Sequence, residues 1–525
     1  MDYSLDDYIE QIGLLHQDEQ VDDAFIEQHS DDAAATAATA KTNIAERQRR
    51  QANTHIIFLS HRSVGNDGLD KLVHAILSAN ENQMEKESRN RINKDSGSLQ
   101  QANGNTYLAK KIHLRCTNIK RGITSLASLL SRSNSTEVLD LSQNELGSEG
   151  ITELCDVISS QCHEQASLHS LFLRRCQIGC KGVIAIASLL VPHNSEWAPL
   201  PIKTLDLSRN EIGIDGVTAL AKAISWDGCS LKALDLSRCN ITGERSRGLH
   251  RLFSVLLSNA RNAAMASANR AFVSTKLPST ENAGNLLTLK LNGNDLDSNC
   301  FNAIAACIAG DSFTDDNNDG KVHYYCPSLK NLYLDNTNMS SSSAKKLAKA
   351  LVTNTGLKIL SLSENLIGDD AAKAFAGGLR SNQTLSLLLL GRSKYITQEG
   401  VEALATCVYD ESHSSALLSL AASNHVIEDF GLGKQTSIRL EHALQFNGSE
   451  NDECSVQRKK IASFLNRECV RTMHHFAAFF AVDQLNSKVG RSAALPFVVR
   501  HCNLSCAFEM MRGMPEVCLR SYFRQ

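Results

Sequence analysis

The chain has 525 residues, of which 42% are hydrophobic, and a formal net charge of −3. That size and composition supply an ample core, while the small net charge excludes a global bias toward nucleic acid. The first fifteen residues lack the basic region of a signal peptide, and no apolar run approaches the ~20 residues of a membrane helix. We therefore expect a cytoplasmic protein, with the nucleus as the alternative location, that binds neither nucleic acid nor membranes.

The N-terminal arm, residues 1–50, is acidic and lies outside any repeat. Residues 1–40 contain eleven Asp or Glu and no Lys or Arg, and Leu5, Ile9 and Ile12 recur at helical spacing. We expect a short acidic amphipathic helix within a partly disordered arm. Runs of charged residues usually only keep a segment solvated. This arm is also a candidate to occupy a basic surface until a partner displaces it.

One residue pattern recurs through residues 51–430, namely L-x-L-x-x-N-x-[IL]-G-x-x-G-x-x-x-L-x-x-x-[IL], and its cleanest copy runs from Leu205 to Ile224. Consecutive unbroken copies are about 27–34 residues apart, which is the period of a leucine-rich repeat with one short strand and one helix per unit. We call the first strand residue of each copy its anchor. The predicted anchors are Ile57, Ile112, Leu139, Leu171, Leu205, Leu234, Leu289, Leu332, Leu360, Leu388 and Leu418.

Each position of the pattern has a physical reason. Positions one and three of the strand point into the core, whereas positions two, four and five point onto the concave face. Position six must satisfy backbone groups beyond the strand, and it is Asn or Cys at Asn144, Cys176, Asn210, Cys239, Asn294 and Asn365. An ordinary βα sheet protein is the alternative, but it would not keep one register across eleven units.

The segments LDLSQNELGSEG and LDLSRNEIGIDG, the alternation of Asn and Cys, and the 28-residue step between the last unbroken repeats resemble the ribonuclease-inhibitor class of leucine-rich repeats. Repeat domains of NOD-like receptors and the Ran GTPase-activating protein belong to the same class. The resemblance covers roughly residues 55–430. It implies an α/β fold, a horseshoe-shaped solenoid with a parallel inner sheet and outer helices, and it says less about function.

The pattern lapses in several places, which defines the predicted domain limits. Polar insertions interrupt the repeats near 78–106, 258–285 and 310–327, and we expect them to form loops at the edge of the solenoid. A polar linker follows at 431–456. The last segment, 457–525, is basic and contains apolar residues at helical spacing, so we expect a small helical cap over the open end of the solenoid.

The search for catalytic or metal-binding chemistry favours a non-enzymatic protein without a cofactor. Asp315, Asn317 and Asp319 match part of a calcium loop, but Cys326 stands where the bidentate Glu belongs, so a polar turn is favoured. The Gly431–Lys434 segment lacks the first glycine of a phosphate loop. Five His and Cys residues between 474 and 506 match no zinc spacing, and buried helical residues are the commoner explanation.

The concave face carries the candidate site, because a column of Arg lies beside a column of Asp in the fourth to sixth repeats. These charges are often only solubilising, since ion pairs at a surface contribute little. Arg and aromatic residues nevertheless dominate interface energies, which favours a site for a protein partner with an acidic segment. The predicted partner-binding residues are Arg115, Phe172, Arg174, Arg175, Asp206, Arg209, Asp235, Arg238 and Tyr333.

We therefore predict a non-enzymatic interaction scaffold or receptor that binds a protein partner on its concave face. The alternative, implied by the resemblance, is a GTPase activator for a small Ran-like GTPase. Against that alternative, the C-terminal segment is basic, with eleven Lys or Arg against four Asp or Glu in residues 458–525, whereas those activators typically carry an acidic tail.

Overall fold

The computed structural model describes residues 56–92, 110–120, 123–132, 136–161, 167–192, 199–242, 247–270, 286–314, 322–325, 328–410 and 423–447, together with Val456 and Lys460. The chain divides into two compact units, of which the first comprises 1–259 and 269–290 and the second 260–268 and 291–525. None of the described helices is long and apolar enough to cross a membrane.

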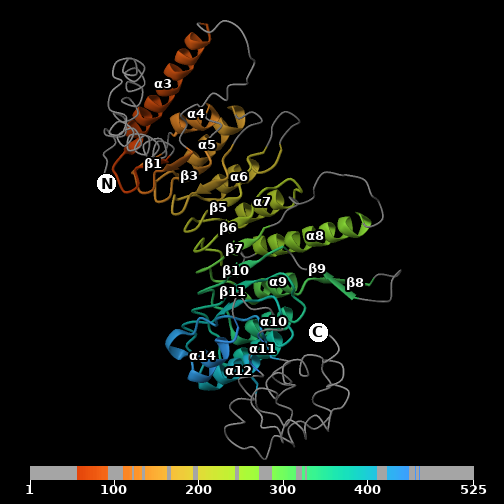
Figure 1. The fold of residues 1–525 in the computed structure, drawn as a ribbon. Coiled ribbons are helices and arrows are strands. Elements are labelled where there is room, and N and C mark those ends of the chain that lie inside the picture. The colour runs from red at the N-terminus through yellow and green to blue at the C-terminus, as the bar shows by residue number, and fades with distance from the viewer. Residues whose placement is uncertain are drawn as a thin grey trace, which may run out of the picture. The chain divides into compact units, whose positions relative to one another are not determined.

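The first unit contains seven parallel strands that pair in chain order and helices that lie on one side of them (Figure 1). We call the other side of the strands the open face. The strands are β1 (Ile56–Phe58), β2 (Lys111–His113), β3 (Val138–Asp140), β4 (Ser170–Phe172), β5 (Thr204–Asp206), β6 (Ala233–Asp235) and β7 (Thr288–Lys290). The helices are α3 (Gly65–Ile92), α4 (Thr124–Arg132), α5 (Gly147–Gln161), α6 (Cys180–Ser188), α7 (Ile214–Ile224) and α8 (Arg247–Arg270).

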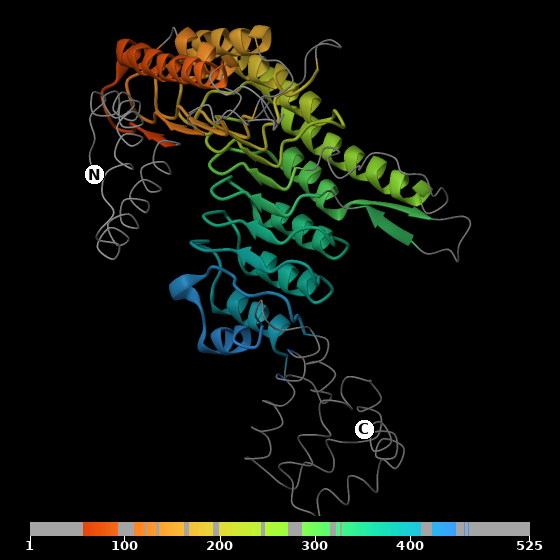
Figure 2. The same ribbon diagram turned by 45° about the horizontal axis from the view of Figure 1, so that its top comes forward.

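The second unit repeats the same strand-then-helix arrangement, which Figure 2 shows from a second angle. Its parallel strands are β10 (Asn331–Tyr333), β11 (Ile359–Ser361) and β12 (Leu387–Leu389). Its helices are α9 (Ser298–Ala309), α10 (Ser341–Leu351), α11 (Asp369–Leu379), α12 (Gln398–Val408), α14 (Ile438–Leu444) and the short 3-10 helix η4 (Gly433–Gln435). An antiparallel hairpin of β8 (Asp311–Thr314) and β9 (Val322–Tyr325) completes the unit.

The predicted register is confirmed by the strands and by their burial. Ten of the eleven predicted anchors are the middle residues of the ten parallel strands, and each is at most 4% exposed. The residue two positions after each of these anchors, such as Leu207, is fully buried. Alternate residues of a strand point to opposite faces, so the intervening position-two residues lie on the open face. The chain is therefore an α/β leucine-rich repeat solenoid.

The position-six Asn residues join consecutive repeats. Asn210 Oδ1 accepts hydrogen bonds from the backbone N–H groups of Cys176 (2.9 Å) and Ile178 (3.1 Å) in the preceding repeat. Its Nδ2 donates to the carbonyl oxygens of Leu173 (2.8 Å) and Leu207 (2.9 Å). One buried amide thus satisfies four main-chain groups that the sheet does not reach, which explains why Asn, with both donors and an acceptor, occupies this position.

The alternate repeats use a smaller residue at the same position because they need only a donor. Cys176 Sγ donates to the carbonyl oxygen of Leu141 at 3.2 Å, and Thr117 Oγ1 donates to that of Leu114 at 2.7 Å. Thr337 repeats the arrangement of Thr117 in the second unit. From Thr117 to Asn365 the predicted alternation of Asn and Cys is therefore one of Asn with Cys or Thr.

The predicted insertions contain more regular structure than expected. Helix α3 continues to Ile92 and helix α8 to Arg270, both well inside the polar stretches predicted as loops. These stretches are rich in Glu, Lys, Asn and Ala and contain no proline near the helices, so a helix already nucleated on the core continues into them. The third insertion forms the β8–β9 hairpin. The predicted calcium-loop residues, 315–320, lie outside the described residues.

The structure corrects the position of the eleventh repeat. Beside β12 the carbonyl oxygens of Asp429 and Phe430 accept hydrogen bonds from the N–H groups of Leu388 (3.1 Å) and Leu390 (2.8 Å). Phe430, which is 1% exposed, therefore takes the place predicted for the anchor Leu418, a residue outside the described part of the chain. The step from 388 to 430 is 42 residues, so extra residues before the last strand displaced it, and Phe in place of Leu concealed the pattern.

The region predicted as a linker, 431–456, contains α14, which packs against α12. Tyr409, at the end of α12, stacks on Phe446 with ring centroids 5.5 Å apart. Val456 and Lys460, on either side of the predicted start of the cap, are both fully buried. The rest of the predicted cap, with its His and Cys candidates, and the acidic arm 1–50 lie outside the described residues.

The cysteines of the described residues are all free thiols, and most are buried. Burial raises the pKa of Cys155, Cys176, Cys239, Cys300 and Cys407 to about 12. A thiol with such a pKa is a poor nucleophile at neutral pH, so these residues serve as small apolar side chains in the core, as expected from their repeat positions.

Candidate functional site

Four arginines gather where β4, β5 and β6 end on the open face of the first unit. We call Arg174, Arg175, Arg209 and Arg238 the arginine cluster. The three strands pair in parallel with the anchors Leu171, Leu205 and Leu234 opposite one another, so equivalent loop positions are about 4.8 Å apart per strand. Arg174 is half-buried and the other three are exposed. The repeat register therefore places the four cationic side chains together.

The electrostatics of the cluster are unfavourable in the free protein. Repulsion by Arg174, with smaller effects of burial and of Arg238 and Arg175, lowers the pKa of Arg209 below its usual value. Within the described residues, no carboxylate oxygen lies within 4.0 Å of any of the four guanidinium groups. In addition, Arg174 Nε is buried and has no hydrogen-bond acceptor among them. A buried donor without an acceptor is costly, so an anionic ligand here would gain both charge pairing and a hydrogen bond.

The neighbouring column of aspartates is largely structural. Asp206 Oδ1 accepts a hydrogen bond from the Ser208 N–H at 2.8 Å, and Asp235 does the same with Ser237 at 2.9 Å. Burial raises the pKa of Asp206, and the nearby charge of Asp235 adds to that effect. Both carboxylates therefore hold the turn after their own strand, and their predicted role in partner binding stays a prediction. The recurring Asp-Leu-Ser triplet is the sequence signal for this role.

The backbone at position five is left-handed in ten consecutive repeats, with φ between 52° and 68°. The residues are His61, Cys116, Gln143, Arg175, Arg209, Arg238, Gly293, Asn336, Glu364 and Arg392. This conformation lets the backbone N–H donate to the next repeat, as Arg209 does to the carbonyl oxygen of Ser237 at 2.8 Å. The backbone thus fixes where three of the four clustered arginines project, which a flexible loop would not do.

Substitutions at Arg209 should separate the backbone requirement from the charge. A non-glycine residue in the left-handed region costs roughly 1–2 kcal/mol, so Arg209→Gly should leave stability unchanged or raise it by up to about 1 kcal/mol. Arg209→Val places a branched Cβ there and should lower stability by about 1–2 kcal/mol. Urea unfolding midpoints of the two variants test this. Equal midpoints would show that the left-handed conformation imposes no such constraint.

The other predicted residues lie outside the cluster. Arg115 follows β2, two strands from β4, and its Nε donates to Gln143 Oε1 at 3.2 Å. Phe172 is half-buried at position two of β4, paired in register between Asp140 and Asp206. Tyr333 occupies the equivalent position of β10 and belongs to the second unit. Of the nine predicted residues, the structure therefore brings together four arginines, with Asp206, Asp235 and Phe172 on the same strands.

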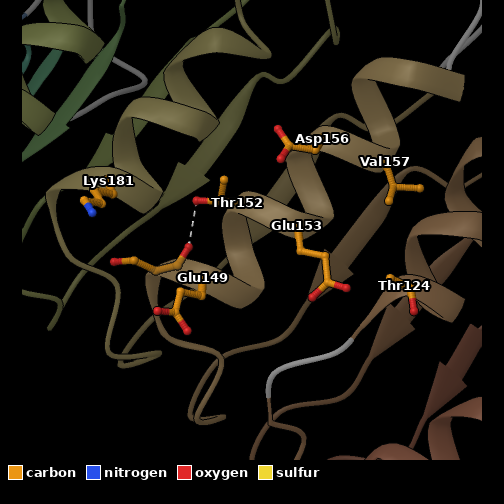
Figure 3. A pocket seen from close by; sticks show the side chains of 8 residues that line it. Thr124, Glu149, Thr152, Glu153, Asp156, Val157 and Lys181 are labelled. Carbon is orange, nitrogen blue, oxygen red and sulfur yellow. Dashed lines mark hydrogen bonds between the residues drawn. The ribbon is translucent and has the colours of Figure 1, made fainter.

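A groove on the helix side of the first unit has a different chemistry (Figure 3). Its lining residues are Thr124, Ser148, Glu149, Thr152, Glu153, Asp156, Val157 and Lys181. Three of these are acidic, and Thr152 Oγ1 is engaged with the Ser148 carbonyl oxygen at 2.8 Å. The groove therefore does not share the cationic character of the open face. Lys181 and Lys222, both exposed on the helix side, serve as positions for matched control substitutions.

Comparison with known proteins identifies the repeats. Residues 137–155, 201–221, 229–244 and 353–376 match a family model described as Leucine Rich repeat. Each stretch contains one strand of the array, namely β3, β5, β6 or β11. These four stretches are leucine-rich repeats. The matches fall on the repeats that keep the sequence pattern most closely.

The relatives agree with the ribonuclease-inhibitor class. The chain is 30% identical over 301 residues to NACHT, LRR and PYD domains-containing protein 3 of Macaca mulatta, covering 54% of this chain and 28% of that protein. It is 25% identical over 274 residues to ribonuclease inhibitor of Sus scrofa, covering 52% and 49%. The chain thus spans about a quarter of the first relative and about half of the second. Among solved structures, LegL7 of Legionella pneumophila is 14% identical at a TM-score of 0.30, over 66% of this chain and 92% of that chain.

Proposed function

We propose that this leucine-rich repeat protein is an interaction scaffold whose protein partner binds the open face of the first unit through the arginine cluster. The observation that carries the proposal is the crowding of four guanidinium groups that have no carboxylate oxygen within 4.0 Å among the described residues. Ribonuclease inhibitor, a relative whose name states that it inhibits another protein, supports a protein ligand for this class of repeat.

The chemistry of the cluster favours an acidic segment of the partner. Guanidinium groups pair with carboxylates through two parallel hydrogen bonds, and they lose less hydration than ammonium groups do on binding. The clustered arginines are held on adjacent strands, so little backbone entropy is lost when a ligand binds. An acidic segment lying across β4 to β6 would relieve the mutual repulsion that lowers the pKa of Arg209.

Charge reversal should weaken partner binding. We expect Arg209→Glu combined with Arg238→Glu to reduce partner capture by the full chain at least tenfold, because about 1.4 kcal/mol of lost attraction corresponds to a tenfold change in affinity. The difference in partner capture between the native chain and the charge-reversed variant should shrink at high salt, because screening already removes part of the attraction. Affinity purification with quantitative mass spectrometry, at low and high salt, measures both effects.

The control is Lys181→Glu combined with Lys222→Glu, which makes the same charge change on the helix side of neighbouring repeats. This control should capture partners as the native chain does. If the control abolishes capture while the open-face variant retains it, the proposal is wrong. Incubating the purified native chain with a panel of small GTPases tests the remaining alternative, since stimulated GTP hydrolysis would identify an activator instead of a scaffold.

A further inference from the structure

We infer that the acidic arm of this chain, residues 1–32, is itself a ligand of the arginine cluster and competes with the protein partner. The inference rests on the proposed function, because it assigns an internal competitor to the same surface. Residues 1–32 contain eleven Asp or Glu and no Lys or Arg. The cluster contributes four positive charges, and among the described residues no carboxylate oxygen lies within 4.0 Å of them, while Asp206 interacts with Arg174 over a longer distance.

The chain is long enough to make this contact within one molecule. The first described strand, β1, is four strands from β5 in the first unit, which is about 19 Å at 4.8 Å per strand. Residues 33–55 connect the arm to β1, and 23 residues can span up to ~75 Å when extended. A random-coil chain of 23 residues has a root-mean-square end-to-end distance of about 27 Å. The arm can therefore reach β4, β5 and β6.

Tethering makes even a weak contact effective. A random-coil connection of 23 residues would give an effective concentration on the order of 1 mM. If the free arm binds with a dissociation constant of about 0.1 mM, the tethered arm occupies the cluster in about nine molecules of ten and weakens a competing ligand about tenfold. Such weak affinity is typical of a few charge pairs at an exposed surface, where screening is strong.

The test uses the full chain and a fluorescent synthetic peptide of residues 1–32 as the probe. In the arm-neutral variant, the eleven acidic residues of the arm are replaced by Asn or Gln. We expect the probe to bind the arm-neutral variant about tenfold more tightly than it binds the native chain. Fluorescence anisotropy titrations at low and at high salt measure this difference, and both affinities should fall as the salt concentration rises.

A second pair of variants locates the site. Adding Arg209→Asn and Arg238→Asn to the arm-neutral chain should remove most of the probe binding, because Asn tolerates the left-handed backbone but carries no charge. Adding Lys181→Asn and Lys222→Asn instead should leave probe binding unchanged.

Three results would overturn the inference: equal affinity of the native and arm-neutral chains for the probe, probe binding that survives the loss of both arginines, or no binding at all. Each result is distinguishable from failure of the proposed function. That function is tested without the probe, by capture of a partner with the native chain and by loss of capture when Arg209 and Arg238 are reversed.

Discussion

Replacing Asn210 with alanine is expected to lower the free energy of unfolding by roughly 3–5 kcal/mol. The substitution leaves two buried N–H groups and two buried carbonyl groups without their partner. An unsatisfied buried polar group costs about 1–3 kcal/mol, and water entering the loop offsets part of that cost for four groups. Because the four groups belong to two repeats, the substitution destabilises the contact between those repeats as well as the loop that contains residue 210.

Urea unfolding of the full chain measures the effect, and Cys176→Ala is the matched control. Cys176 occupies the same position in the preceding repeat and donates one thiol hydrogen bond to Leu141, so its replacement should cost about 1 kcal/mol or less. A loss at Asn210 no larger than that at Cys176 would contradict the role assigned to the amide.

Replacing Lys460 with methionine should change how stability depends on pH. Lys460 is fully buried, and its Nζ donates to the carbonyl oxygens of Val408 (2.8 Å) and Asn424 (2.7 Å) and lies 3.2 Å from His425 Nδ1. Burial lowers the pKa of Lys460 from 10.5 to about 7. Below pH 7 the amine is charged in both states, so folding carries the full cost of burying the charge. Between pH 7 and 10.5 only the unfolded chain holds the extra proton, so stability rises with pH.

The native chain should therefore gain roughly 2 kcal/mol relative to Lys460→Met between pH 7 and pH 9, at about 1.4 kcal/mol per pH unit once the amine is neutral. The neighbouring Cys407 thiol does not titrate in this range, because burial raises its pKa to about 12. Urea midpoints of both proteins at the two pH values give the difference. A difference independent of pH would mean that Lys460 is not buried as described.

The burial of Lys460 could not be predicted from the sequence. Residues 457–525 were predicted to form a basic helical cap, and their Lys and Arg content did not indicate that Lys460 would be buried against the end of α12. A lysine is seldom buried without partners, and its acceptors here, Val408 and Asn424, are main-chain groups from distant parts of the chain. No pattern within the segment itself could reveal them.

The repeat core was predictable because burial imposes a periodic pattern. The strand leucines recur where the stacked repeats need an apolar side chain. The position-six Asn recurs where they need a side chain that both donates and accepts hydrogen bonds. Ten anchors were therefore placed correctly. The eleventh was missed because the preceding insertion broke the period and Phe430 replaced leucine.

The backbone of position five was not predictable from residue type. Among these ten residues Gly293 adopts the left-handed region without strain and Asn336 tolerates it, while Arg175, Arg209 and Arg238 have no such preference. The backbone N–H groups of Arg175 and Arg209 donate to Ser208 and Ser237 of the next repeat, and these hydrogen bonds exist only in the stacked structure. The candidate site thus depends on a tertiary constraint that overrides local propensity.

Arginine-specific chemical labelling of the arm-neutral variant, in which the acidic arm does not compete for the cluster, with and without the bound partner, tests the central claim most directly. Arg175, Arg209 and Arg238 are exposed in the free chain, and Arg392, 83% exposed in the second unit, serves as the reference. If the partner binds the open face of the first unit, labelling of Arg209 and Arg238 with a dicarbonyl reagent should slow at least tenfold in the complex, while Arg392 reacts at an unchanged rate. Labelling of Arg209 and Arg238 at the free-chain rate in a saturated complex would contradict the assignment of the arginine cluster as the binding site.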